Sequence, residues 1–177
     1  ILKVILKQNN SGFKYDFDNM ERHILSYLGR PDICNDYVIC GKDHWEDNKN
    51  IYIITNLAEG TELSEYMKTK NCETFNKKEL VILKLCQGLF YMHNIGVIHK
   101  DIKPSNIRIG PFKNDDNIEL DNNFNVKYID FGLACLTHYQ DQFNECSKHK
   151  AGTVLYLKPE NILPADLAIK IFYKDLK

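Results

Sequence analysis

The sequence predicts an α+β fold, and two patterns along the 177-residue chain carry that prediction. Short apolar runs typical of strands occupy residues 1–6, 37–40 and 51–54. A long apolar segment with helix signals at both ends then occupies residues 76–96. Strands that precede a long buried helix, instead of alternating with helices, are typical of an α+β chain.

The first third of the chain is predicted to hold a buried strand at residues 1–6 and one amphipathic helix. Asn19 or Asp18 can cap this helix, and Gly29 ends it. One face of the helix collects the apolar residues Met20, Ile24, Leu25 and Leu28.

The middle of the chain is predicted to be a loop at residues 41–50, a small helix after Thr61, and then the longest helix. Asn76 starts the long helix through a capping box with Glu79, and Gly96 ends it. Because the long helix is apolar on nearly all sides, we expect it to be buried.

The segment after the long helix combines short apolar runs with one hydrophilic insertion. Residues 113–125 are rich in Asn and Asp, so we expect a surface loop with no chemistry of its own. A strand is predicted at residues 126–129.

Composition and charge exclude several classes of protein. Apolar residues make up 44% of the chain and charged residues 27%, which is typical of a soluble globular protein. The net charge of −1 gives no electrostatic drive toward nucleic acid or an anionic membrane, and we expect neither as a partner. No apolar run reaches the ~18 residues of a membrane span. The chain opens at Ile1 inside an apolar run, as we expect of a fragment.

The six cysteines show no CxxC pair and no zinc-ligand spacing. Cys86 falls within the helix that we expect to be buried. We therefore predict reduced, structural cysteines in an intracellular protein, in the cytoplasm or the nucleus. The six are Cys34, Cys40, Cys72, Cys86, Cys135 and Cys146.

Residues 99–106, HKDIKPSN, place three groups useful for phosphoryl transfer within six positions. Asp101 offers an acceptor for a hydroxyl proton, and Lys103 offers a positive charge near a migrating phosphate. Asn106 offers an oxygen ligand for Mg²⁺. Taken alone, a His and an Asp in a loop are more often a turn and a solvated charge.

Two further motifs follow in order. Asp130 begins the triplet DFG at the end of an apolar run, and residues 152–160 read GTVLYLKPE. With the 99–106 segment, they resemble the catalytic loop, the DFG segment and the end of the activation segment of eukaryotic protein kinases. The resemblance implies a two-lobe kinase-like fold, truncated at both ends. Residues 1–58 would belong to the N-lobe and 59–177 to the C-lobe.

The resemblance also implies nucleotide-binding roles early in the chain. Lys3 is similar to the lysine that holds the α- and β-phosphates, and Glu21 to its ion-pair partner in the first helix. Lys7 is a rival for Lys3, although only Lys3 has two apolar residues on each side.

Residues 51–60 resemble the strand and hinge that meet the adenine. Thr55 would then be the gatekeeper. The backbone carbonyl of Asn56 and the backbone N–H of Ala58 would meet the adenine edge. Glu62 would lie near the ribose.

Several positions depart from the family pattern. Lys100 replaces an arginine that grips an activation-segment phosphate, and lysine offers only a point charge. Arg108 stands where an apolar residue usually forms the floor of the adenine pocket; its stem could cover the ring while its guanidinium reaches out. Lys158 replaces an alanine. Ser147 is the predicted phosphorylation site of the activation segment, with an unmodified serine as the alternative.

The resemblance therefore implies a serine/threonine protein kinase that uses ATP and Mg²⁺ and acts on a protein substrate. Asp101 and Lys103 would be catalytic, Asn106 and Asp130 would hold the metal, and Thr153 would support serine/threonine selectivity. Two alternatives remain open: a catalytically dead pseudokinase that acts as a scaffold, and a small-molecule phosphotransferase with a similar loop.

Overall fold

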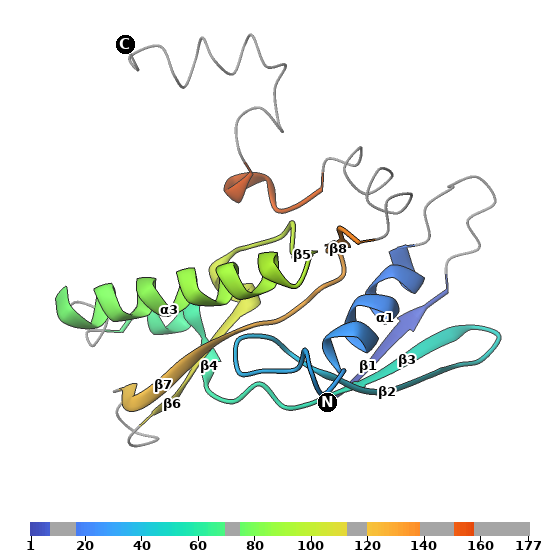
Figure 1. Cartoon of the computed structure of the whole chain (residues 1–177), viewed down its shortest axis with the longest axis horizontal. Helices are drawn as coiled ribbons and strands as arrows, with labels where there is room; N and C mark the ends of the chain where they lie inside the picture. Colours follow the sequence, from blue (N-terminus) through green and yellow to red (C-terminus); the bar gives the residue numbers. More distant parts are fainter. Residues whose placement is uncertain (8–16, 70–74, 113–119, 139–150, 158–177) are drawn as a thin grey trace, which may run out of the picture.

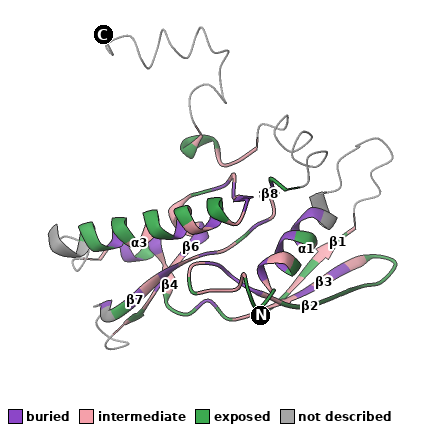
Figure 2. Cartoon of the chain, in the orientation of Figure 1, coloured by how far each residue is buried: buried purple, intermediate pink, exposed green. Residues whose placement is uncertain are grey.

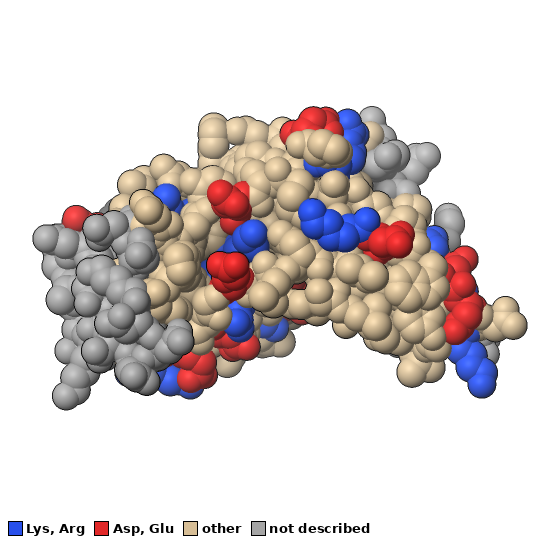
Figure 3. Space-filling view, turned by 90° about the horizontal axis from the view of Figure 1, so that it is seen from below, with Lys and Arg blue, Asp and Glu red and all other residues tan. Residues whose placement is uncertain are grey.

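A computed structural model describes residues 1–7, 17–69, 75–112, 120–138 and 151–157 of the chain. Within these ranges the chain forms a three-stranded antiparallel sheet backed by a helix, followed by a second part with a long helix and a second three-stranded sheet (Figure 1). None of the described helices is both long and apolar enough to cross a bilayer. Basic and acidic side chains are interspersed on the face drawn in Figure 3.

The first sheet has the strand order β1-β3-β2, with β1 at Leu2–Leu6, β2 at Gly41–Glu46 and β3 at Asn50–Thr55. Ile51 and Ile53 of β3 are buried. The helix α1, Phe17–Leu28, packs against β2 and β3. Four of its apolar residues are buried, namely Met20, Ile24, Leu25 and Leu28. These are the residues that the sequence predicts on one helix face, and that prediction is confirmed.

The boundaries of α1 and β2 differ from the prediction. Helix α1 starts at Phe17, before both predicted caps, and ends before Gly29 as expected. Strand β2 lies inside the segment predicted to be a loop, whereas residues 37–40 form only a single bridge, from Val38 to Tyr128. An edge strand that is mostly exposed does not need apolar residues, so β2 carries no alternating pattern in the sequence.

The second part of the chain starts with β4, Thr61–Glu62, and the predicted small helix α2, Leu63–Tyr66. Strand β4 pairs with β6, Ile107–Phe112, and β6 pairs with β7, Leu120–Tyr128. Because β7 starts at Leu120, the prediction of a loop throughout residues 113–125 is wrong. The buried side chains of Leu120 and Phe124 explain why this polar stretch forms a strand.

The long helix α3, Phe75–Asn94, occupies the predicted segment, but only one of its faces is buried. Val81 and Met92 are buried, and α3 contacts β7 and the short strand β5, Val97–Ile98. The residues on the opposite face are exposed (Figure 2), and several of them are apolar. The exposed residues are Leu80, Ile82, Leu83, Cys86 and Phe90. The prediction of a fully buried helix is therefore wrong, because no described element covers this face.

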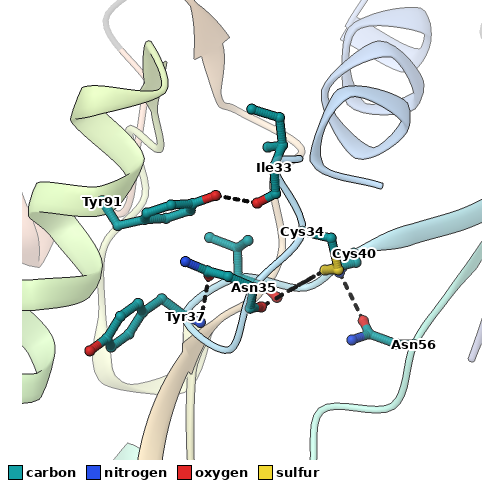
Figure 4. Close-up of a disulfide and its surroundings, with 8 residues drawn as sticks. Ile33, Cys34, Asn35, Tyr37, Cys40, Asn56 and Tyr91 are labelled. Atoms are coloured by element: carbon teal, nitrogen blue, oxygen red, sulfur yellow. Dashed lines mark hydrogen bonds between the residues drawn. A yellow bond between two sulfur atoms is a disulfide. The ribbon is translucent and has the colours of Figure 1, made fainter. Parts of the chain in front are cut away.

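Three cysteines are disulfide-bonded, which contradicts the prediction of reduced cysteines. Cys34 and Cys40 form a disulfide between α1 and β2 (Figure 4). Cys135 of β8, Cys135–Leu136, is also disulfide-bonded. The segment from Cys34 to Cys40 turns back on itself and brings the two Cα atoms to 5.6 Å, within the range that a disulfide requires. Sequence spacing alone does not reveal that turn.

Candidate active site

A cavity of about 470 Å³ lies where the first sheet meets the second part of the chain. Most of its walls are apolar, and they include Leu25, Ile39 and Ile129. Six residues that the sequence predicts to bind nucleotide or metal also line it: Lys3, Glu21, Thr55, Ala58, Arg108 and Asp130. An apolar cleft with a few convergent polar groups is the usual form of a small-molecule site.

Lys3 joins two carboxylates that are far apart in the sequence. Its Nζ lies 2.6 Å from Glu21 Oε1 and 3.2 Å from Asp130 Oδ1. Glu21 is buried, whereas Asp130 is about half exposed. Burial lowers the pKa of Lys3, but the two carboxylates outweigh that effect and raise its pKa above the usual value. Lys7, the rival candidate, instead contacts the Asp47 carbonyl and the Glu46 carboxylate.

The carboxylate of Asp101 is held by hydrogen bonds to both of its oxygens. Its Oδ1 accepts from the backbone N–H and the hydroxyl of Thr153, each at 2.7 Å. Its Oδ2 accepts from Asn106 Nδ2 at 2.9 Å and lies 2.8 Å from Lys103 Nζ. Burial raises the pKa of Asp101, but the hydrogen bonds from Lys103 and Thr153 prevail and lower the pKa to about 2. Asp101 is therefore ionised at neutral pH and can accept a proton.

Lys103 and Thr153 are also bonded to each other. Lys103 Nζ donates to Thr153 Oγ1 over 2.7 Å, while the same hydroxyl donates to Asp101. Thr153 lies directly before the short 3₁₀ turn η3, Val154–Tyr156, so this triangle ties that segment to the catalytic loop.

The catalytic loop rests on a buried histidine to which the sequence analysis assigns no role. His99 lies against the ring of Phe131, with ring centroids 4.8 Å apart, and its Nε2 is 2.9 Å from the Ile129 carbonyl. Burial lowers the pKa of His99, which favours the neutral ring. His99 thus connects the loop that carries Asp101 to the segment that carries Asp130. In the sequence, the signal for this role is the position of His99 two residues before Asp101.

The remaining nucleotide-binding candidates differ in their positions. Asn56 and Glu62 are not among the residues that line the cavity. Asn56 is bonded to Cys40 through both its side chain and its backbone N–H, and Glu62 Oε2 accepts from the Ser64 hydroxyl at 3.0 Å. Arg108 lines the cavity and donates from Nη2 to the Gly60 carbonyl. Its Nε is buried and has no hydrogen-bond partner among the described residues.

Comparisons with known proteins assign the family. The family model "Protein kinase domain" matches residues 1–171. The chain belongs to the protein kinase family. The predicted α+β kinase fold is thereby confirmed.

Two of the similar proteins are themselves named as kinases. Calcium-dependent protein kinase 6 of Plasmodium berghei is 34% identical over 162 residues, which are 90% of this chain and 9% of that protein. Serine/threonine-protein kinase 33 of Bos taurus is 30% identical over 128 residues, 72% of this chain and 26% of that protein. The chain thus spans about a quarter or less of the length of these relatives.

Lys100, which replaces the family's arginine, has a left-handed backbone with φ of 66°. A Cβ on Gly152 would lie 2.6 Å from the Lys100 carbonyl oxygen, so this kinase domain needs glycine there. Burial lowers the pKa of Lys100. Ser147, the predicted phosphorylation site, and Lys158 lie outside the described residues.

The donor groups around Asp101 and Asp130 fit Mg²⁺, which prefers oxygen ligands and takes one or two carboxylates together with substrate phosphates. Asn106 Nδ2 donates to both the backbone carbonyl and the carboxylate of Asp101, so its amide oxygen takes no part in these two bonds. Among the described residues, no group of three or more His, Cys, Asp or Glu side chains is placed to hold a metal ion.

Proposed function

We propose that this chain is the catalytic core of a serine/threonine protein kinase, which transfers the γ-phosphoryl group of ATP to a protein hydroxyl. The observation that carries the proposal is the convergence of Lys103, Asn106 and Thr153 on the ionised carboxylate of Asp101. A positioned proton acceptor beside a cation meets the main needs of phosphoryl transfer.

In this mechanism, Asp101 orients the substrate hydroxyl and accepts its proton, while Lys103 offsets the charge of the transferred group. Lys3, which Glu21 holds in place, contacts the α- and β-phosphates within the cavity. Asn106 and Asp130 would hold Mg²⁺, which neutralises phosphate charge. We place the boundary between the two lobes at residue 58, after the first sheet and its helix.

The proposed substrate is a protein serine or threonine, inside the cell. Serine/threonine over tyrosine selectivity is supported by the residue types of Lys103 and Thr153, which resemble those of serine/threonine kinases and are bonded directly to each other. A binding-only pseudokinase is the second candidate. One observation favours it: the charged Arg108 side chain in a cavity that should hold an adenine ring.

Steady-state phosphorylation by the full-length protein tests the proposal. The assay uses Mg-ATP with matched peptides that carry serine, threonine or tyrosine as the only acceptor. Asp101→Asn should reduce kcat on the serine and threonine peptides by about a hundredfold or more, the usual scale for a positioned general base. Asp43→Asn, an exposed change on β2, is the matched control and should leave turnover unchanged.

Near wild-type turnover by Asp101→Asn would contradict the role of Asp101. Nucleotide binding without turnover in the wild-type protein would favour the pseudokinase.

A further inference from the structure

The segment from Cys34 to Cys40 is bonded directly to the hinge of the cavity. The Cys40 N–H donates to Asn56 Oδ1 over 2.8 Å, and the Cys40 carbonyl accepts from the Asn56 N–H over 3.0 Å (Figure 4). Asn56 follows Thr55, and Ile39 precedes Cys40; both Thr55 and Ile39 line the cavity. The position of Cys40 therefore sets the position of two parts of the cavity wall.

The same segment is also bonded to β7, and its neighbour Ile33 is bonded to α3. The Ile39 N–H donates to the Tyr128 carbonyl over 3.0 Å, and the Tyr37 carbonyl accepts from the Tyr128 N–H over 2.8 Å. Tyr128 lies two residues before Asp130. From α3, the Tyr91 hydroxyl donates to the Ile33 carbonyl (Figure 4). A movement of this segment would therefore reach the hinge, α3 and the approach to Asp130 together.

The disulfide is the covalent constraint on this junction. Cys40 is fully buried and Cys34 is half-buried, so Cys34 is the sulfur that a thiol can approach. Disulfides with an accessible sulfur are the more readily reduced ones, and regulatory disulfides belong to that group.

We propose that the Cys34–Cys40 disulfide is a redox-controlled clamp that keeps the nucleotide cavity in its binding shape, an inference that rests on the proposed kinase function. A dithiol reduces the clamp by exchange: the S–S bond breaks, Cys34 and Cys40 each become a thiol, and the dithiol becomes a disulfide. Two electrons and two protons pass to the protein. The freed segment must then be ordered again whenever nucleotide binds, so the affinity falls.

The experiment compares nucleotide affinity in proteins with and without this one bond. Full-length wild-type protein and Cys34→Ser are purified without reductant and titrated with Mg-ATP by calorimetry. The Cys135 disulfide is intact in both. Cys34→Ser should bind at least about fivefold more weakly, the lower end of usual coupling between sites. Hydrogen exchange at residues 33–40 and 56–60 should be faster in Cys34→Ser.

Dithiothreitol provides the second measurement, and it also serves if Cys34→Ser fails to fold. It should weaken binding by wild-type protein and by Cys135→Ser, which lacks the other described disulfide. It should not change binding by Cys34→Ser. Cys86→Ser, a change at an exposed free cysteine, is the matched control and should respond as wild type does.

Each remaining outcome counts against the inference. Equal affinities in oxidised wild type and Cys34→Ser would overturn the clamp and leave the proposed kinase function intact. So would an affinity that dithiothreitol lowers in wild type but not in Cys135→Ser, because the other disulfide would then be responsible. No Mg-ATP binding by oxidised wild-type protein would overturn the proposed function, and the clamp with it.

Discussion

The catalytic loop and the nucleotide-binding wall differ in how completely the chain itself pairs their charges. Asp101 is buried, and both of its carboxylate oxygens accept hydrogen bonds from other residues of the chain. In the cavity wall, the side chains of Lys3 and Asp130 are 42% and 49% exposed, and the Arg108 Nε has no partner among the described residues. The chain thus preorganises the proposed proton acceptor, whereas the proposed nucleotide side presents charge that a ligand can complete.

The largest expected effect on kcat comes from a substitution beside Asp101. Lys103→Met removes the cation that contacts both Asp101 and Thr153. We expect kcat to fall by about a hundredfold or more, because electrostatic stabilisation of the reacting groups is lost. Steady-state kinetics on a serine peptide measure the effect. Lys42→Met on β2 is the control, and a similar kcat for the two variants would refute the contrast between the regions.

A smaller effect is expected on the nucleotide side. Lys3→Met removes the ammonium that lies 2.6 Å from the buried Glu21 carboxylate. Hydrogen bonds to charged groups contribute about 1.5–3 kcal/mol, so Mg-ATP affinity should fall roughly tenfold or more. Calorimetric titration measures it, with Lys7→Met as the control because Lys7 contacts Asp47 and Glu46 instead. A larger loss in Lys7→Met would show that the rival lysine holds the phosphates.

Arg108→Leu should strengthen Mg-ATP binding, in contrast to Lys3→Met, which should weaken it. Leucine would offer the adenine ring an apolar floor and would remove the cost of covering a guanidinium charge on binding. We expect Mg-ATP to bind about fivefold more tightly. Weaker binding in the same titration would mean that the guanidinium contributes to nucleotide recognition.

The smallest effect concerns the pH dependence of stability through His99, which lies between the two regions. Its lowered pKa means that the unfolded chain binds a proton more readily than the folded chain does. This contribution to stability is complete above pH 6.5, the usual histidine pKa, and is lost as the pH falls through the lowered folded pKa. His99→Phe should therefore lose less stability than wild type does between pH 7 and pH 5 in urea titrations. Parallel losses would contradict a buried neutral ring.

The candidate residues were predictable because phosphoryl transfer constrains residue types at short, fixed spacings. Asp101, Lys103 and Asn106 lie within six positions, and the apolar residues around Lys3 mark a strand. The role of His99 was missed because a histidine in a loop has no periodic signal. The sequence also predicted that Glu62 lies near the ribose, but Glu62 is not among the residues that line the cavity.

The sequence by itself determined the family and the candidate charged residues for the proposed chemistry, because both are encoded over short distances along the chain. Only the tertiary structure decided which groups meet. Thr153 lies 52 positions from Asp101 and yet donates two hydrogen bonds to it. Strand β2 forms from polar residues because β3 supplies its partners, and Cys34 and Cys40 meet because the chain turns between them. Contacts of this kind depend on the geometry of the whole fold, which local patterns of polarity do not record.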